Sequence, residues 1–223
     1  MIDLPELRNR VHVFRDRAHA GGVLAGMLGK YRKTASVVLA VPAGGVAVGA
    51  VLAKELSLSL EVAVVSKITF SWNSEAGYGA VAFDGTVLLN EDLLSRYHLG
   101  DEEIEAGTRK TEEKVRRRME AFRGDRRLPD FKGPVILVDD GLASRFTLRV
   151  AILALRKAGA AEIVLAVPTA HSESIQTIPE EVEVVYCPNL RRGLSFAVAD
   201  AYEEWRDLDE GEVSKILQDF KKP

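Results

Sequence analysis

The stretch VILVDDGLASRFTLRV, residues 135–150, decides how the fold is interpreted. Its apolar run is typical of a buried parallel strand and ends in two adjacent carboxylates, Asp139 and Asp140. Gly141 and a short polar loop follow, and a helical pattern begins at about Phe146. Adjacent like charges at the end of a buried segment repel each other, so they must be solvated or bound. The stretch predicts a strand, a loop and a helix, and raises the question of what the two acids hold.

The rest of the chain continues this alternation of strands and helices. SVVLAVP (36–42) predicts a buried strand, and the small and aliphatic residues from Gly44 onward predict a helix packed on a sheet. Further strands are predicted at 60–66, 133–140, 161–168 and 182–186, and further helices at about 18–31, 146–158 and 171–178. This order predicts an α/β fold with a doubly wound, mostly parallel sheet.

Three segments are predicted to decorate this core. Asp84-Gly85, within 78–90, is a strong signal for a small β-hairpin. A polar helical insertion is predicted at about 91–125, and a C-terminal hood or helix at about 188–223. The sequence has no internal repeat and no low-complexity linker, so we expect one domain spanning 1–223.

The composition is that of an ordinary globular protein and narrows the classes of function. The 223 residues are 47% hydrophobic and 28% charged, with a formal net charge of −3 that gives no overall attraction to nucleic acid. The single cysteine, Cys187, excludes an internal disulfide framework, fits a reducing compartment and is expected to be a buried filler. No apolar stretch reaches the roughly 18 residues of a membrane span, and the N-terminus lacks an apolar signal region. We therefore expect a cytoplasmic protein with no membrane partner.

Three predicted strand ends carry unusual residues, and ligands of doubly wound sheets bind beyond the carboxyl ends of the strands. These ends are Pro42-Ala43-Gly44-Gly45, Ser66-Lys67 and Asp139-Asp140-Gly141. Each alone has a structural explanation: a tight turn, a solvated lysine and a loop cap. Together their chemistry is complementary, because carboxylates accept hydrogen bonds from sugar hydroxyls, whereas glycine amides, a lysine and a helix N-terminus attract phosphates.

These residues carry a resemblance to a known family. The stretch 135–149 resembles the signature of type I phosphoribosyltransferases: an apolar strand, two acids, a glycine, a small hydroxylated loop and a helix. VLAVPAGGV (38–46) resembles their pyrophosphate-binding turn, and VSKI (65–68) resembles a strand end that often supplies a basic residue. A poorly characterised bacterial and archaeal branch is similar in three more segments: FRDRAHAG (14–21), NSEAGYGAV (73–81) and ADAYEEWRDLDEGEV (199–213).

The resemblance implies roles for the residues at the three strand ends. Asp139 and Asp140 would hydrogen-bond the ribose 2′- and 3′-hydroxyls of phosphoribosyl pyrophosphate. The 5′-phosphate would lie on Gly141, Leu142, Ala143, Ser144, Arg145, Phe146 and Thr147, with Ser144 and Thr147 as hydroxyl donors. The pyrophosphate would carry Mg²⁺ and would face Ala43, Gly44, Gly45 and Lys67.

The implied reaction is displacement of pyrophosphate from ribose C1′ by a base nitrogen, or its reverse. It needs mainly positioning and charge stabilisation, because the transition state resembles an oxocarbenium ion. Lys67 and Glu75 are the candidate catalytic residues, and the small residues of ITFSWNSEAGYGA (68–80) suit a lid that excludes water. The base would be recognised by the variable hood, and a homodimer is implied by analogy only.

Two alternatives stay open beside a transferase. Arg145 stands where most members have glycine, Phe146 where they have a small residue, and Ala43 where the related branch has arginine. The chain can therefore also be a non-catalytic protein that senses phosphoribosyl pyrophosphate or a nucleotide. Aromatic residues of the hood, Phe196, Tyr202 and Trp205, can stack on a base or pack in the core.

The basic segment RKTEEKVRRRMEAFRGDRR (109–127) offers an electrostatic contact to nucleic acid. Phe122 is the one aromatic residue in this segment, so the charges have no regular aromatic interleaving and nucleic acid is not an expected partner. A solvated helix with the i,i+4 pairs Glu112–Arg116 and Glu113–Arg117 explains the segment as well.

Overall fold

The computed structural model describes residues 1–124, 127–143, 145–176, 178, 181–193 and 195–222, and of Ser74, Glu75 and Arg145 only the backbone. Its core is a five-stranded parallel sheet with the order β2-β1-β6-β7-β9. The strands are β1 (Val37–Ala40), β2 (Ser59–Val62), β6 (Val135–Val138), β7 (Ile163–Ala166) and β9 (Val184–Tyr186). The order reverses between β1 and β6, which confirms the predicted doubly wound sheet and places its switch point there.

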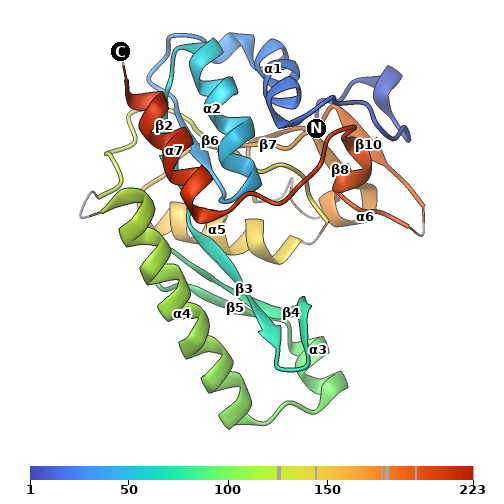
Figure 1. Cartoon of the computed structure of the whole chain (residues 1–223), viewed down its shortest axis with the longest axis vertical. Coiled ribbons are helices and arrows are strands. Elements are labelled where there is room, and N and C mark those ends of the chain that lie inside the picture. Colours follow the sequence, from blue (N-terminus) through green and yellow to red (C-terminus); the bar gives the residue numbers. More distant parts are fainter. Residues whose placement is uncertain (125–126, 144, 177, 179–180, 194, 223) are drawn as a thin grey trace.

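Helices cover both faces of this sheet (Figure 1). They are α1 (Arg17–Met27), α2 (Gly44–Leu56), α5 (Arg145–Lys157), the short α6 (Ser172–Ile175) and α7 (Glu210–Lys221). Alternate strand residues point to opposite faces, so Ile136 packs in one hydrophobic cluster with α1, α2 and α7, and Leu137 in another with α5. Cys187 is fully buried in the second cluster, as predicted, and burial raises the pKa of its thiol. In the described part of the chain, no helix combines the length and the apolar character needed to cross a membrane.

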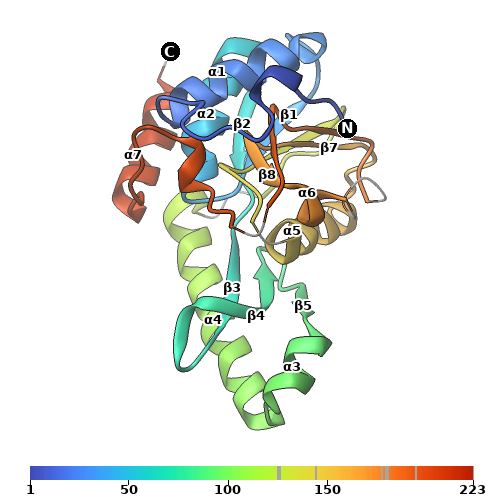
Figure 2. The same ribbon diagram turned by 90° about the vertical axis from the view of Figure 1, so that its right-hand side faces the viewer.

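A second, antiparallel sheet and two helices project from this core, and we call residues 65–123 the extension (Figure 2). The elements are β3 (Val65–Phe70), β4 (Asn73–Ala82), β5 (Val87–Leu89), α3 (Glu91–Tyr97) and α4 (Asp101–Arg123). The predicted hairpin joins β4 to β5, with Gly85 at φ 84° and the Thr86 amide donating to Asp84 Oδ1 over 2.9 Å. Two helices fill the predicted insertion.

The start of the extension corrects one prediction. The segment 60–66 is not one strand, because the chain leaves the parallel sheet after β2 and enters β3 at Val65. Ser66 and Lys67 therefore lie inside an antiparallel strand, with Ser66 buried and Lys67 exposed, and not at a parallel strand end.

The basic face of α4 pairs with α7 instead of pairing along the helix. Arg118 Nε donates to Glu210 Oε1 over 2.9 Å, and Arg117 Nη2 lies 3.8 Å from the same oxygen. This contact differs from prediction because α7, almost a hundred residues later, brings its first carboxylate against the helix. The ion pairs of the described residues do not include Glu112–Arg116 or Glu113–Arg117.

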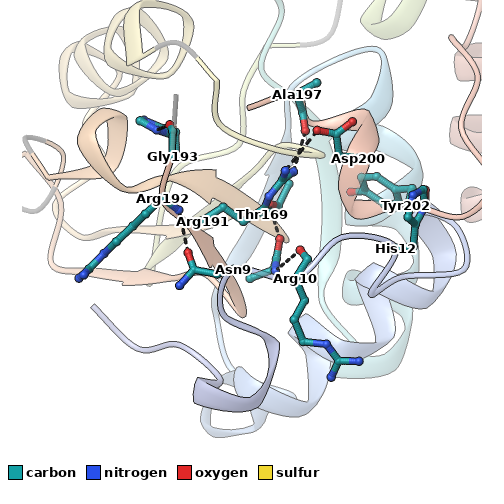
Figure 3. Close-up of polar contacts among 12 residues, drawn as sticks. Asn9, Arg10, His12, Thr169, Arg191, Arg192, Gly193, Ala197, Asp200 and Tyr202 are labelled. Carbon is teal, nitrogen blue, oxygen red and sulfur yellow. Dashed lines mark hydrogen bonds and ion pairs between the residues drawn. The ribbon is translucent and has the colours of Figure 1, made fainter. Parts of the chain in front are cut away.

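β8 (Thr169–His171), β10 (Asn189–Arg191) and residues 195–209 form the part of the structure that we call the hood from here on. Figure 3 shows polar contacts among its residues and with the N-terminal segment. Asn189 is fully buried, accepts a hydrogen bond from Thr169 Oγ1 over 2.6 Å and donates to the Arg10 carbonyl oxygen over 3.1 Å. Arg191 reaches Asp200 Oδ2 at 3.2 Å. These bonds connect the N-terminal segment around Arg10 and the C-terminal segment around Asp200 to β10.

Candidate functional site

The turns after β1 and β6 meet at the switch point of the sheet. Ala40 pairs with Val138, so the residues that follow each strand leave the sheet side by side. A Cβ on Gly44 would lie 1.7 Å from Asp140 Oδ2, and one on Gly45 would lie 2.8 Å from the Val138 carbonyl oxygen. A side chain at Gly44 would displace Asp140 or Arg17, and one at Gly45 would meet backbone atoms, so both positions favour glycine. The peptide bond from Pro42 to Ala43 in this turn is cis. The structure thus brings the predicted double glycine against the predicted acids.

Asp139 is partly buried and is held by the backbone of its neighbour. Its Oδ1 accepts a hydrogen bond from the Asp140 amide over 2.9 Å. Burial raises the pKa of the Asp139 carboxyl well above its ordinary value, and the negative charge of Asp140 raises it further. Hydroxyl groups that donate hydrogen bonds to Asp139 would stabilise its ionised form against this burial.

Asp140 forms an ion pair that the sequence did not reveal. Arg17 Nε, at the start of α1, donates to Asp140 Oδ2 over 2.8 Å, and the two side chains are only 10% and 16% exposed. The hydroxyl of Tyr202 donates to the Asp140 carbonyl oxygen over 2.5 Å. Burial, and then the negative charge of Asp140, raise the pKa of Tyr202 well above its ordinary value. The acid pair is therefore joined to α1 and to the hood.

Arg17 is enclosed by the C-terminal segment. Its Cζ lies 3.9 Å from the ring centroid of Trp205, and its Nη1 donates to the Arg206 carbonyl oxygen over 2.8 Å. A cavity of about 460 Å³ opens beside it. The cavity is lined by Asp16, Arg17, Ala18, Ala47, Glu203, Glu204, Trp205, Arg206 and Leu208. The sequence signal for Arg17 was its place in FRDRAHAG, to which no role had been given.

The loop after Asp140 is partly occupied by the hood. A Cβ on Gly141 would lie 2.4 Å from Cγ1 of Val198, so glycine is required for this contact. Leu142 is buried, and its amide donates to the Thr169 carbonyl oxygen over 2.9 Å. Because this amide already donates to a carbonyl oxygen of the protein, Leu142 is not among the phosphate ligands proposed below. Ala143 is exposed, and its carbonyl oxygen accepts from Ser174 Oγ over 2.8 Å.

The first turn of α5 completes this loop. Ser144 and the Arg145 side chain lie outside the described residues, whereas the Arg145 backbone begins the helix. Phe146 and Thr147 follow within the first turn, and both are partly exposed. The predicted order of acids, loop and helix is therefore present in the described backbone.

The two candidate catalytic residues lie in the extension. Lys67 is exposed on β3, opposite Ala80, and its charge acts on Lys114 of α4. The pKa of Lys114 is lowered by burial first and by Arg118 second, with a smaller contribution from Lys67. Glu75 belongs to β4, but its side chain lies outside the described residues. These two residues are thus carried by a different sheet from the acids.

The hood aromatics have different surroundings. Tyr202 is fully buried, with its ring 5.7 Å from that of Phe14, so its use in the core is confirmed. Trp205 lies against Arg17. Phe196 is partly exposed, 5.6 Å from the His171 ring and 5.0 Å from the Arg191 guanidinium carbon. Phe196 and Trp205 are both partly exposed, so Tyr202 alone of the three is fully enclosed.

Comparison with known proteins agrees with this geometry. A sequence profile described as the phosphoribosyl transferase domain matches residues 17–200. The chain belongs to the phosphoribosyltransferase family. A protein of Mycobacterium tuberculosis, called "Putative phosphoribosyl transferase" in two strains, is 34% identical over 206 residues. The match covers 92% of this chain and 46% of that protein, so the chain spans about half the length of this relative. The crystal structure of TT1426 from Thermus thermophilus superposes with a TM-score of 0.71 at 32% identity, over 93% of this chain and 98% of that one.

Proposed function

We propose that this phosphoribosyltransferase-family protein binds phosphoribosyl pyrophosphate, or a nucleoside 5′-monophosphate, at the switch point between β1 and β6. In this proposal it transfers the phosphoribosyl group to or from a nitrogenous base. The observation that carries the proposal is the contact between the acid pair and the double-glycine turn. A sugar ligand and a phosphate ligand can share this one edge of the sheet.

The acids are the proposed ribose ligands. Asp139 and Asp140 each offer carboxylate oxygens to neutral hydroxyl donors, and the Asp140 carboxylate is already oriented by the bond from Arg17 Nε. Hydrogen bonds that involve an ionised group are about twice as strong as neutral ones. The adjacent 2′- and 3′-hydroxyls match two adjacent carboxylates.

The proposed 5′-phosphate ligands are Gly141, Ala143, Ser144, Arg145, Phe146 and Thr147. The start of α5 directs amide groups and the positive end of the helix dipole toward this loop, which favours an anion. The pyrophosphate would lie at the start of α2, on Ala43, Gly44 and Gly45, and Lys67 of β3 is its fourth proposed ligand.

Mg²⁺ is proposed to enter with the pyrophosphate. Within the described residues, no group of three or more His, Cys, Asp or Glu side chains is placed to hold a metal ion. Mg²⁺ prefers phosphate oxygens and water, so this donor set fits an ion carried by the ligand. The ion would neutralise charge on the leaving group.

The protein contributes positioning and charge stabilisation to the proposed reaction. The bond from C1′ to the pyrophosphate oxygen breaks, and a bond from C1′ to the base nitrogen forms. The proton that the base loses passes to the departing pyrophosphate or to water. Positive charge develops on the ribose next to the acids, while negative charge develops on the pyrophosphate next to the turn at Gly44.

A non-catalytic binding protein is the second candidate, and a specific observation favours it. The turn after β1 carries no charged side chain at Ala43, and Asp140 is already neutralised by Arg17. Such a protein would bind the same ligand without turnover. The two candidates differ only in release of pyrophosphate.

The test combines binding with turnover. We expect the protein to bind phosphoribosyl pyrophosphate with Mg²⁺ in calorimetry, and to release pyrophosphate when the correct purine or pyrimidine base is added. Asp139→Asn combined with Asp140→Asn should weaken binding at least about 100-fold, because two hydrogen bonds to charged groups are weakened. Binding without release for any base would favour the sensor.

A second carboxylate next to an arginine provides the control. Asp200→Asn removes the contact with Arg191 in the hood and leaves the switch point intact. We expect this variant to bind as the parent does, within about twofold. If the double variant binds as tightly as the parent, the ribose assignment is wrong.

A further inference from the structure

Arg17 occupies the position where the double-glycine turn lacks a cation. The turn after β1 has Ala43 before its glycines and so brings no charge of its own. A Cβ on Gly44 would lie 2.8 Å from Arg17 Nε, which shows that the guanidinium of Arg17 sits directly against this turn. The positive charge at the turn therefore comes from α1, a different element of the fold.

The partners of Arg17 leave it able to take another ligand. Within the described residues, its hydrogen bonds are those from Nε to Asp140 and from Nη1 to the Arg206 carbonyl oxygen. A guanidinium carries five N–H donors in a planar fork that matches phosphate oxygens. Arg17 also lines the cavity of about 460 Å³. The side chain is thus held by two hydrogen bonds that use two of its five donors, and it borders a cavity whose lining also includes Asp16, Glu203 and Glu204.

We propose that Arg17 is the pyrophosphate-binding cation of this site, and that it passes from Asp140 to the ligand when ribose hydroxyls reach Asp140. This inference rests on the proposed function. Without ligand, Asp140 and Arg17 neutralise each other at 2.8 Å in a partly buried place. With ligand, neutral hydroxyls take the carboxylate and the anionic pyrophosphate takes the guanidinium. No charge is left without a partner in either state.

Trp205 makes Arg17 suitable for this exchange. Its ring lies 3.9 Å from Cζ of Arg17 and fixes the plane of the guanidinium, whichever anion the edge of the guanidinium contacts. A donor that is already oriented needs little reorganisation as negative charge grows on a leaving group. Trp205 is therefore a positioning residue, and Arg17 is the group that would touch the ligand.

The test compares phosphoribosyl pyrophosphate with two ligands that each contain a part of it. Ribose 5-phosphate has the phosphorylated ribose but no pyrophosphate, and inorganic pyrophosphate with Mg²⁺ has the pyrophosphate but no ribose. Arg17→Gln should weaken binding of the first and third by about 10-fold to 100-fold, the loss of one charged hydrogen-bonding group. Binding of ribose 5-phosphate should not weaken, because this ligand has no pyrophosphate for Arg17 to contact.

One matched control and two further variants separate a direct contact with pyrophosphate from a general effect on the fold. Arg15→Gln alters an exposed arginine two residues earlier, paired with Asp16, and should change none of the three affinities. Arg17→Lys keeps the charge beside Asp140, so it tests the same selectivity if Arg17→Gln fails to fold, and it should lose part of the pyrophosphate affinity. Trp205→Leu should lower the turnover number or the pyrophosphate affinity and leave ribose 5-phosphate binding unchanged.

Several results would overturn the proposal. An equal loss for all three ligands would show that Arg17 only orients Asp140. Tighter binding of ribose 5-phosphate and of phosphoribosyl pyrophosphate by Arg17→Gln would show that the ion pair is an obstacle. If the parent binds none of the three, the proposed function itself fails and this inference falls with it.

Discussion

The switch point and the extension hold the two parts of the predicted site in different ways. At the switch point, β1 and β6 are paired residue by residue, so Gly44 and Asp140 are placed by the same register that buries the core. In the extension, Lys67 stands on an antiparallel sheet of its own, beside α4. The position of the first pair depends on the parallel sheet, whereas that of Lys67 also depends on how a second sheet is oriented.

This difference predicts where a small change has a large effect. Gly44→Ala should be the most damaging single methyl group, because its Cβ would lie 1.7 Å from Asp140 Oδ2. The carboxylate must move, and its pair with Arg17 is then lost. We expect a loss of stability of about 1–3 kcal/mol, the usual cost of overpacking, and at least a tenfold loss in affinity for phosphoribosyl pyrophosphate. Denaturant unfolding and calorimetry measure the two effects.

Gly26→Ala is the matched control for this substitution. Gly26 lies inside α1, and a Cβ there would meet nothing within 4 Å. Alanine should stabilise the helix by about 0.5–1 kcal/mol and leave ligand affinity unchanged. Equal effects of the two substitutions would mean that the contact between the two turns is not specific.

Asp139 provides a smaller effect that depends on pH. The pKa of this carboxyl is raised in the folded chain, so above about pH 4 the folded state binds more protons than the unfolded state. Stability is then lost as pH rises through this window toward the raised value. Asp139→Asn removes the loss, and its stability relative to the parent should grow with pH, by at most about 1.4 kcal/mol per pH unit. Urea unfolding from pH 4 to 7 measures it, and a difference that is constant with pH would contradict the raised pKa.

The same comparison explains what the sequence could reveal. The apolar runs of β1 and β6 and the residues that follow them are local patterns, so both strands and both turns were predicted. Lys67 was misplaced because VSKI follows β2 without a turn signal, although it starts a new strand. β8 and β10 were not predicted because each has three residues and pairs with a partner about twenty positions away.

Arg17 was missed because its role depends entirely on distant residues. Asp140 lies 123 positions away along the chain, and Arg206 lies 189 positions away. Nothing in the spacing of FRDRAHAG distinguishes Arg17 from Arg15, which ends at the surface with Asp16. Only the folded arrangement of α1, β6 and the C-terminal segment separates the two arginines.

The smallest effect is expected where the extension meets the core. Arg118→Gln removes the 2.9 Å pair with Glu210 but keeps the first two methylene groups of the side chain. The Glu210 side chain is 39% exposed and retains Arg117 at 3.8 Å. We therefore expect the free energy of unfolding to fall by only about 0.2–1 kcal/mol, and by less at high salt.

Arg116→Gln, on the same helix, should lower the free energy of unfolding by less, since Arg116 is exposed and its predicted pair with Glu112 is not formed. A double-mutant cycle with Glu210→Gln isolates the pair, and neither arginine variant should alter ligand affinity. If Arg118→Gln weakens ligand binding as strongly as Gly44→Ala does, the extension and the switch point act as one unit and the distinction between them is wrong.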